Sequence, residues 1–149
     1  MEIKKNDCFT VSIEDMSEDG SGIGKLDGYI WFIKDAVKGD VVEAKAMKMK
    51  KSYGFARLMR VITPSPDRIE PACPVARQCG GCQLQAMSYE EQLKFKENKV
   101  RNNLSRIGGL TEIPMEPIIG MEEPWRYRNK AQFPFGKDKN GRIITGFYA

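Results

Sequence analysis

Apolar and polar residues alternate over short stretches in the first part of the chain, which is the pattern of half-buried β-strands. Turns that contain glycine separate these stretches, and Asp27-Gly28 is a two-residue hairpin signal. The strands are expected at residues 8–14, 23–26, 29–33, 41–49 and 53–62. Because no helical period interrupts them, the sequence predicts a small closed or nearly closed five-stranded barrel.

A glycine string at Gly20, Gly22 and Gly24 matches a nucleotide-binding loop weakly. Such a loop joins a strand to a helix, and the helix N-terminus holds the phosphate. Here the glycines lead into another strand pattern. The sequence therefore does not predict a phosphate-binding loop.

A proline-rich stretch, residues 63–71, separates the barrel pattern from a helical one. Its three prolines favour an extended linker, so we place a domain boundary within it. The clearest helix is expected from about Tyr89 to Ile107 and is stopped by Gly108-Gly109. Ser88 is the expected N-cap, and Glu91 would complete a capping box. One face of this helix is apolar and is expected to pack in a core, at Tyr89, Leu93, Val100, Leu104 and Ile107.

Strand-forming residues return at 125–133, and Asn140-Gly141 predicts a turn before a returning strand at 143–148. We expect this second β unit to continue beyond the end of the chain. The predicted fold is therefore mainly β with an α+β part: an OB-like barrel, a Cys-rich loop, one long helix and an incomplete β domain. The expected domains are residues 1–64, 65–87 and 88–149.

Composition narrows the class of protein. The chain has 149 residues, of which 41% are apolar and 30% charged, as in a soluble globular protein. It has no apolar run near the roughly 20 residues that cross a bilayer, and its N-terminus lacks a secretory signal. Four cysteines in such a chain favour a reducing compartment. We therefore expect a cytoplasmic protein with no membrane partner.

Positive charge is concentrated in three stretches, 45–60, 94–106 and 126–130, although the net charge is only +4. A single basic stretch is most often a solvated face. Three of them interleaved with aromatic residues favour a polyanion, above all nucleic acid. The candidate RNA contacts are Lys45, Lys48, Lys50, Lys51, Arg57 and Arg60 for phosphates, Tyr53 and Phe55 for stacking, and Arg126, Arg128 and Lys130 as a further basic track.

Three cysteines, Cys73, Cys79 and Cys82, form a C-x5-C-x2-C pattern in a chain without histidine. The missing histidine excludes mixed Cys/His zinc sites. A four-thiolate zinc site, an iron–sulfur cluster and unliganded thiols remain open. The other cysteine, Cys8, falls in the first expected strand and is interpreted as a small buried apolar residue. A fourth metal ligand is therefore expected outside this chain.

The barrel, entered through residues 13–24 and closed at Val61, resembles a TRAM domain, an OB-like RNA-binding module. Cys73-Pro74, Cys79-Gly80-Gly81-Cys82 and Gln83-Leu84-Gln85 resemble the cluster-binding segment of the RNA 5-methyluridine methyltransferases. Residues 124–130 resemble the start of that family's central domain. The order, with the TRAM-like part before the cysteines, differs from that of methylthiotransferases.

The resemblance implies a [4Fe–4S] cluster held by Cys73, Cys79, Cys82 and a fourth cysteine downstream of Ala149. It also implies a C-terminal Rossmann-like domain, in which a catalytic cysteine adds to C6 of a uridine and S-adenosylmethionine methylates C5. We find neither a candidate catalytic cysteine nor a pattern for the methyl-donor domain in this chain. We therefore expect no catalytic residue here and no activity of the chain alone. The expected function is RNA binding for a uridine-C5 methyltransferase of the 23S rRNA type, without an obligate protein partner.

Two other classes of function stay open. A non-enzymatic zinc-binding OB-fold adaptor would use Cys8 as its fourth ligand, and an iron–sulfur electron carrier has only the incomplete cysteine set in its favour. Metal analysis after anaerobic purification separates them. Iron with labile sulfide supports the methyltransferase, and stoichiometric zinc supports the adaptor.

Overall fold

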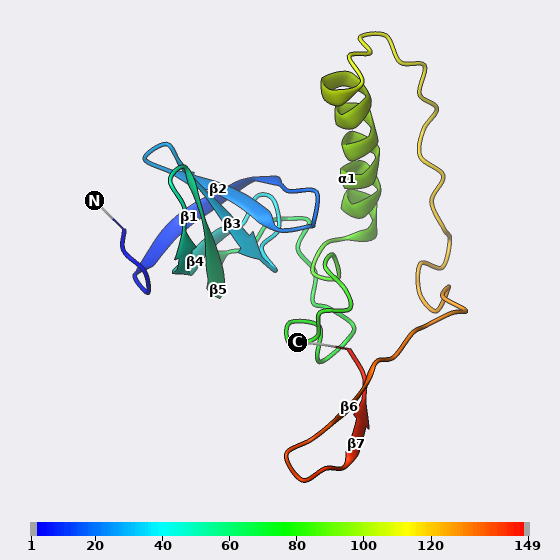
Figure 1. The fold of residues 1–149 in the computed structure, drawn as a ribbon. Coiled ribbons are helices and arrows are strands. Elements are labelled where there is room, and N and C mark those ends of the chain that lie inside the picture. Colours follow the sequence, from blue (N-terminus) through cyan, green and yellow to red (C-terminus); the bar gives the residue numbers. More distant parts are fainter. Residues whose placement is uncertain (1–2, 148–149) are drawn as a thin grey trace.

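A computed structural model of the chain describes residues 3–147. Its largest element is a closed barrel with the strand order β1-β2-β3-β5-β4, which confirms the predicted mainly β, OB-like fold. Figure 1 shows the barrel beside a single helix, with a small hairpin near the C-terminus. Only β3 and β5 pair in parallel; the other barrel neighbours are antiparallel. The strands are β1 (Cys8–Met16), β2 (Gly22–Leu26), β3 (Tyr29–Lys34), β4 (Val41–Met49) and β5 (Tyr53–Thr63).

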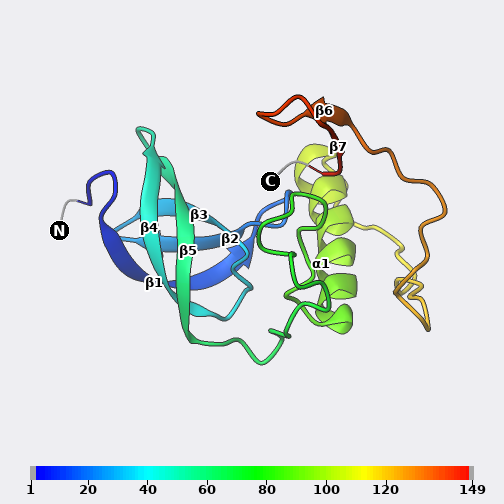
Figure 2. The same cartoon turned by 90° about the horizontal axis from the view of Figure 1, so that it is seen from below.

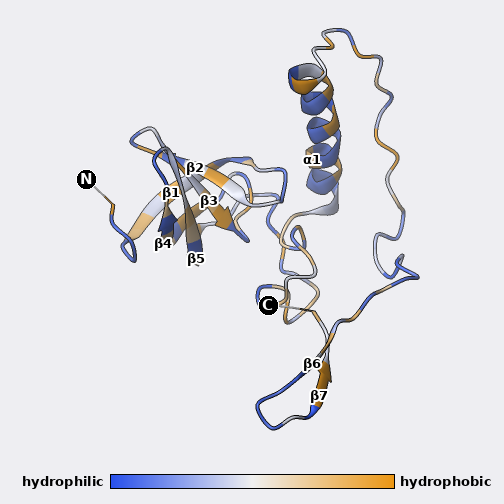
Figure 3. Cartoon of the chain, in the orientation of Figure 1, coloured by the Kyte–Doolittle hydropathy of each residue, from blue (hydrophilic) through white to orange (hydrophobic). Residues whose placement is uncertain are grey.

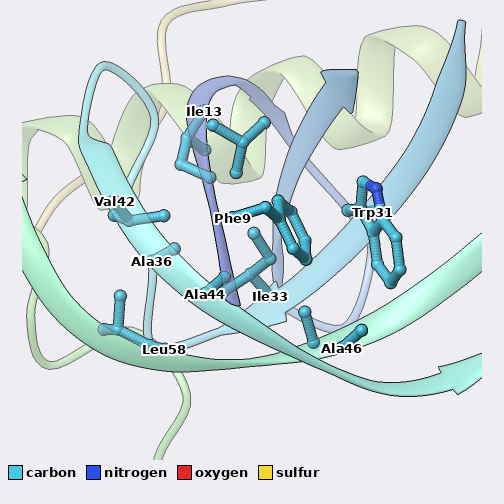
Figure 4. Close-up of a cluster of buried hydrophobic side chains, with 11 residues drawn as sticks. Phe9, Ile13, Trp31, Ile33, Ala36, Val42, Ala44, Ala46 and Leu58 are labelled. Atoms are coloured by element: carbon cyan, nitrogen blue, oxygen red, sulfur yellow. The ribbon is translucent and has the colours of Figure 1, made fainter. Parts of the chain in front are cut away.

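The barrel encloses a core because each strand turns alternate side chains inward. In β1, Phe9, Val11 and Ile13 are buried, and the residues between them are exposed. Trp31 is only 1% exposed, and its ring centroid lies 4.5 Å from that of Phe9. The other core residues are Ile33, Ala36, Val42, Ala44, Ala46, Ala56 and Leu58 (Figure 4).

Two strand glycines are required by this packing. A Cβ on Gly54 would lie 2.6 Å from Cζ3 of Trp31, and a Cβ on Gly24 would lie 2.6 Å from Cγ2 of Val11. Gly24 belongs to β2, which pairs with β1 and β3. The glycine string is therefore part of a strand and its turn, and close strand packing accounts for it.

The proline-rich segment after β5 is anchored to the barrel by a buried ion pair. Asp40 is 0% exposed, and the Arg68 guanidinium donates to its carboxylate at 2.7–3.1 Å. The same carboxylate accepts the N–H groups of Val37 and Ser65 at 2.7 and 2.8 Å. Arg68 also donates to the carbonyl of Asp35 at 2.6 Å. The expected extended linker is thus held against the β3–β4 turn.

The predicted helix is present as α1 (Tyr89–Asn102), which continues as one π-helical turn, η1 (Asn103–Ile107). Ser88 caps it, because its hydroxyl accepts the Glu91 N–H at 3.3 Å. The expected capping box is incomplete: the Ser88 N–H donates instead to the carbonyl of Asp67 at 2.8 Å. No helix within residues 3–147 combines the length and hydropathy that a membrane span requires.

The apolar stripe of this helix is not buried as expected. No residue of α1 or η1 is buried, and Val100 and Ile107 are 50% and 80% exposed. Figure 3 shows apolar positions on a largely hydrophilic helix. Partial cover comes from the segment after the helix, where the Met121 N–H donates to the Tyr89 hydroxyl at 2.8 Å. Within the described residues no second layer covers the stripe, which is why the expected core packing is absent.

The second β unit is smaller than predicted. It consists of β6 (Phe135–Lys137) and β7 (Ile143–Thr145), which pair antiparallel around the expected turn. No strand forms at 125–133: Arg126 has a φ of +57°, and a strand needs a hydrogen-bonded partner that this part of the described chain does not supply. Tyr148, the expected end of the returning strand, lies outside the described residues.

Candidate nucleic-acid interface

Three aromatic rings form a cluster on the outside of the barrel. Phe32 comes from β3, and Tyr53 and Phe55 come from β5; the parallel register places Phe32 opposite Phe55. The ring centroids lie 5.7–5.8 Å from one another. Tyr53 and Phe55 are 37% and 42% exposed. The cluster therefore presents ring surface to solvent, as a base-stacking platform does.

Basic side chains flank the cluster. The strand register places Lys34 opposite Arg57, Arg57 opposite Lys45, and Lys48 opposite Phe55. In β3 and β5 the residues between these side chains face the core. In β4 a register irregularity between Ala46 and Lys48 lets both Lys45 and Lys48 pair with outward residues of β5. We call the resulting surface the aromatic–basic face: Phe32, Lys34, Lys45, Lys48, Tyr53, Phe55 and Arg57. A phosphate backbone and its bases can both be bound by such a surface.

Three other predicted contacts lie near this face. Lys50 and Lys51 are exposed in the β4–β5 turn, and the Tyr29 hydroxyl donates to the Lys50 carbonyl at 2.8 Å, which fixes the turn. Arg60 differs, because its Nε lies 2.9 Å from Oε2 of Glu43. Part of its charge is therefore already neutralised within the barrel.

The predicted basic track at Arg126, Arg128 and Lys130 is exposed but lies in an irregular segment. In the part of the chain that the structure describes, no hydrogen bond or ion pair joins these side chains to the barrel. The fold thus brings the predicted contacts of β4 and β5 together and leaves this track apart from them.

Sequence reasoning missed Phe32 and Lys34. The stretch 29–33 is apolar throughout, so alternation alone could not separate inward from outward side chains. Burial of Trp31 and Ile33 sets the phase and turns the residues on either side outward.

A groove of about 470 Å³ opens beside the aromatic cluster. The cluster and Ile30 supply its apolar lining, and Ser52 comes from the β4–β5 turn. The β1–β2 loop adds Ser17, Glu18 and Asp19. The groove therefore combines ring surface with hydrogen-bonding groups, as ligand pockets commonly do.

The Asp19 carboxylate is held in place by its own loop. It accepts a hydrogen bond from the Ser17 hydroxyl and one from the Ser21 N–H, the latter at 3.3 Å. The Ser17 hydrogen bond lowers the pKa of Asp19 below its usual 3.8, with partial burial opposing the effect. Asp19 is therefore ionised at neutral pH and can only accept hydrogen bonds.

The cysteine segment lies between the barrel and α1 (Figure 2). Its Arg77 guanidinium donates to the carbonyl of Leu58 in β5 at 3.2 Å. Gly20 of the β1–β2 loop lies so close that an added Cβ would be 3.0 Å from Cδ2 of Leu84. The Cys79 N–H donates to the carbonyl of Val75 at 2.8 Å. The segment is thus a compact loop that contacts the barrel through backbone and side-chain groups.

The three cysteines of this segment are free thiols. Cys73 and Cys79 are half-buried, Cys82 is exposed, and the Gly81 N–H points at the Cys79 Sγ at 3.4 Å. Cysteine sulfurs that accept an N–H···S contact are the type of ligand that iron–sulfur clusters use. Their positions do not form a complete site: within residues 3–147 no three Cys, Asp or Glu side chains form a group that could hold a metal.

Cys8 is exposed, so its interpretation as a buried residue was wrong. The reason is strand phase: Phe9 faces the core, which turns Cys8 outward. Cys8 pairs with Lys45 at the start of β1 and belongs to no metal-ligand group among the described residues. The structure therefore offers no support for the zinc adaptor that would use Cys8.

Comparison with known proteins places these features in a family. The model of the TRAM domain matches residues 4–59. An uncharacterized RNA methyltransferase of Halalkalibacterium halodurans is 53% identical over 98% of this chain and 32% of its own length. One from Listeria monocytogenes serotype 4b is 50% identical over 98% of this chain and 32% of its own length. The chain thus spans about a third of the length of the curated relatives it matches.

Among solved structures, the tRNA (uracil-54, C5)-methyltransferase of Pyrococcus abyssi, in complex with S-adenosyl-L-homocysteine, is 28% identical. The match covers 68% of this chain and 21% of that chain, with a TM-score of 0.44. The family assignment rests on the domain match and on the sequence relatives. The chain contains a TRAM domain at residues 4–59 and is related along almost its whole length to proteins named RNA methyltransferases, of which it spans about a third.

Proposed function

We propose that this chain is the RNA-binding part of a methyltransferase that methylates C5 of uridine, with ribosomal RNA as substrate. The main support is the exposed aromatic–basic face on a TRAM barrel. In this proposal S-adenosylmethionine is the methyl donor. We propose that its site and the reacting groups belong to the roughly two thirds of the relatives' length that this chain does not span.

Uridine C5 is proposed as the target because of the cysteine segment. Cys73-Pro74 and Cys79-Gly80-Gly81-Cys82 resemble the cluster-binding segment of the RNA 5-methyluridine methyltransferases. The barrel alone does not distinguish one RNA modification from another, since its face binds backbone charge and ring surfaces.

The aromatic–basic face would bind RNA in two ways. Lys48 and Arg57 would pair with phosphates beside the rings, and Lys50 and Lys51 would extend these contacts to the turn. Tyr53 and Phe55 would stack with unpaired bases. Strands with unstacked bases are therefore the favoured RNA class.

Salt titration of the 149-residue chain tests the RNA-binding proposal. Affinity for an RNA with unpaired loops should fall steeply with salt, because each neutralised phosphate releases counterions. Arg57→Gln should lower the slope of log K against log salt by about one. Lys139→Gln, an exposed substitution on the β6–β7 turn, should leave it unchanged. No binding at low salt, or a flat salt response, would contradict the proposal.

We also propose that Cys73, Cys79 and Cys82 bind an iron–sulfur cluster with a fourth cysteine from outside this chain. When bound, the cluster would hold this segment between the barrel and α1, a structural role. In a longer protein that includes the fourth cysteine, Cys79→Ser should lose the iron and labile sulfide that are measured after anaerobic purification, and Cys8→Ser should retain them. Stoichiometric zinc without sulfide would contradict this part of the proposal.

A further inference from the structure

The groove beside the aromatic cluster carries negative charge on an otherwise basic surface. Glu18 and Asp19 line it, and the nearby outward side chains include Lys34, Lys48 and Arg57. In the part of the chain that is described, the Glu18 side chain makes no hydrogen bond or ion pair. An ionised carboxylate in this place repels phosphate, so the basic surface alone does not account for it.

The loop that carries the two carboxylates is fixed by hydrogen bonds of its backbone. The Ser17 N–H donates to the carbonyl of Ser21 at 2.8 Å, and the Gly20 N–H donates to the carbonyl of Ser17 at 2.9 Å. Lys99 of α1 donates to the carbonyl of Glu18 at 2.9 Å. The loop therefore closes on itself and is fixed to the helix.

We propose that this groove binds one unpaired base with an exocyclic amine (cytosine, adenine or guanine), and that Glu18 and Asp19 accept its hydrogen bonds. The inference rests on the proposed RNA binding and adds base selectivity to it. Phe32, Tyr53 and Phe55 supply ring surface for any base. The carboxylates favour an edge that carries an amine: an amine donates to them, whereas the one donor on the pairing edge of uracil, N3–H, lies between two carbonyl oxygens that a carboxylate repels.

The base that the groove is proposed to bind differs from the base that is proposed to be methylated. A uridine is the proposed methyl acceptor, and uracil is the base that this groove disfavours. The groove would therefore bind a neighbouring nucleotide and set the register of the strand along the aromatic–basic face.

Binding of short oligoribonucleotides to the 149-residue chain tests the inference. The probes are a uridine decamer and three decamers with one central cytidine, adenosine or guanosine, measured by fluorescence anisotropy at constant salt. One amine-bearing base should tighten binding at least about fivefold, the lower range for a hydrogen-bonded base edge. Glu18→Gln should lower this ratio toward one without weakening binding of the uridine decamer, because Asp19 alone then accepts from the amine.

Two further variants separate stacking from base selection. Phe32→Leu keeps apolar volume but removes a ring, so it should weaken all four oligonucleotides by similar factors of about 5 to 100. Glu90→Gln, an exposed substitution on α1, should change neither affinity nor selectivity. Thermal unfolding of each variant confirms that it is folded.

The outcomes distinguish the two proposals. Equal affinity for all four decamers, or a selectivity that Glu18→Gln leaves unchanged, overturns the base-selective groove and leaves RNA binding intact. Failure of the folded chain to bind any RNA overturns both.

Discussion

Replacing Arg68 by alanine should destabilise the barrel strongly. The substitution leaves the Asp40 carboxylate, which is 0% exposed, without its cation. Removing one partner of a buried ion pair typically costs about 3–5 kcal/mol. Two circumstances favour the lower end: the N–H groups of Val37 and Ser65 still hold Asp40, and Arg68 is 17% exposed, so water can replace part of it. We expect a loss of about 3 kcal/mol and a fall in Tm of roughly 10 °C.

Urea titration followed by circular dichroism and by tryptophan fluorescence measures this loss. Arg60→Ala is a matched control, because Arg60 also pairs with one carboxylate, at 2.9 Å from Glu43, but is 69% exposed. An exposed pair of this kind contributes less than about 1 kcal/mol. Equal, small losses in the two variants would refute the reasoning that the buried pair anchors the proline-rich segment.

Two other predictions concern packing and pH. Gly54→Ala should destabilise the barrel by about 2 kcal/mol, because the new Cβ would lie 2.6 Å from Trp31. Gly136→Ala, whose Cβ would lie 3.7 Å from Ile144, should be tolerated. Chemical unfolding of both variants measures the difference. The lowered pKa of Asp19 means that its contribution to stability is complete well above pH 3.8 and is lost as pH falls through the lower folded-state pKa. The stability difference between the parent chain and Asp19→Asn should therefore be constant near neutral pH and shrink below pH 3.8; a difference that does not change with pH would contradict it.

The barrel could be predicted from sequence because its signals are local. Alternation places Phe9, Val11 and Ile13 on one side of β1, and the Asp27-Gly28 turn joins β2 to β3. The same rule could have corrected Cys8, since a residue next to a buried Phe9 in a strand must face outward.

The features that the sequence did not reveal depend on contacts between distant segments. Lys38-Gly39-Asp40 has the composition of a turn, and nothing local indicates that Asp40 pairs with Arg68. The aromatic cluster needs the parallel pairing of β3 with β5, which places Phe32 beside Phe55. Helical periodicity predicts an apolar stripe on α1 but not what covers it. The prediction that this stripe is buried in a core was therefore wrong.

The central claim is that the outer face of β3 and β5 binds RNA through the aromatic cluster. Photocrosslinking tests it directly, with an oligoribonucleotide that carries a single 5-iodocytidine in an unpaired stretch and with crosslinked residues identified by mass spectrometry. Crosslinks are predicted at Phe32, Tyr53 or Phe55. Crosslinks confined to residues 125–137, with none on the barrel, would contradict the account.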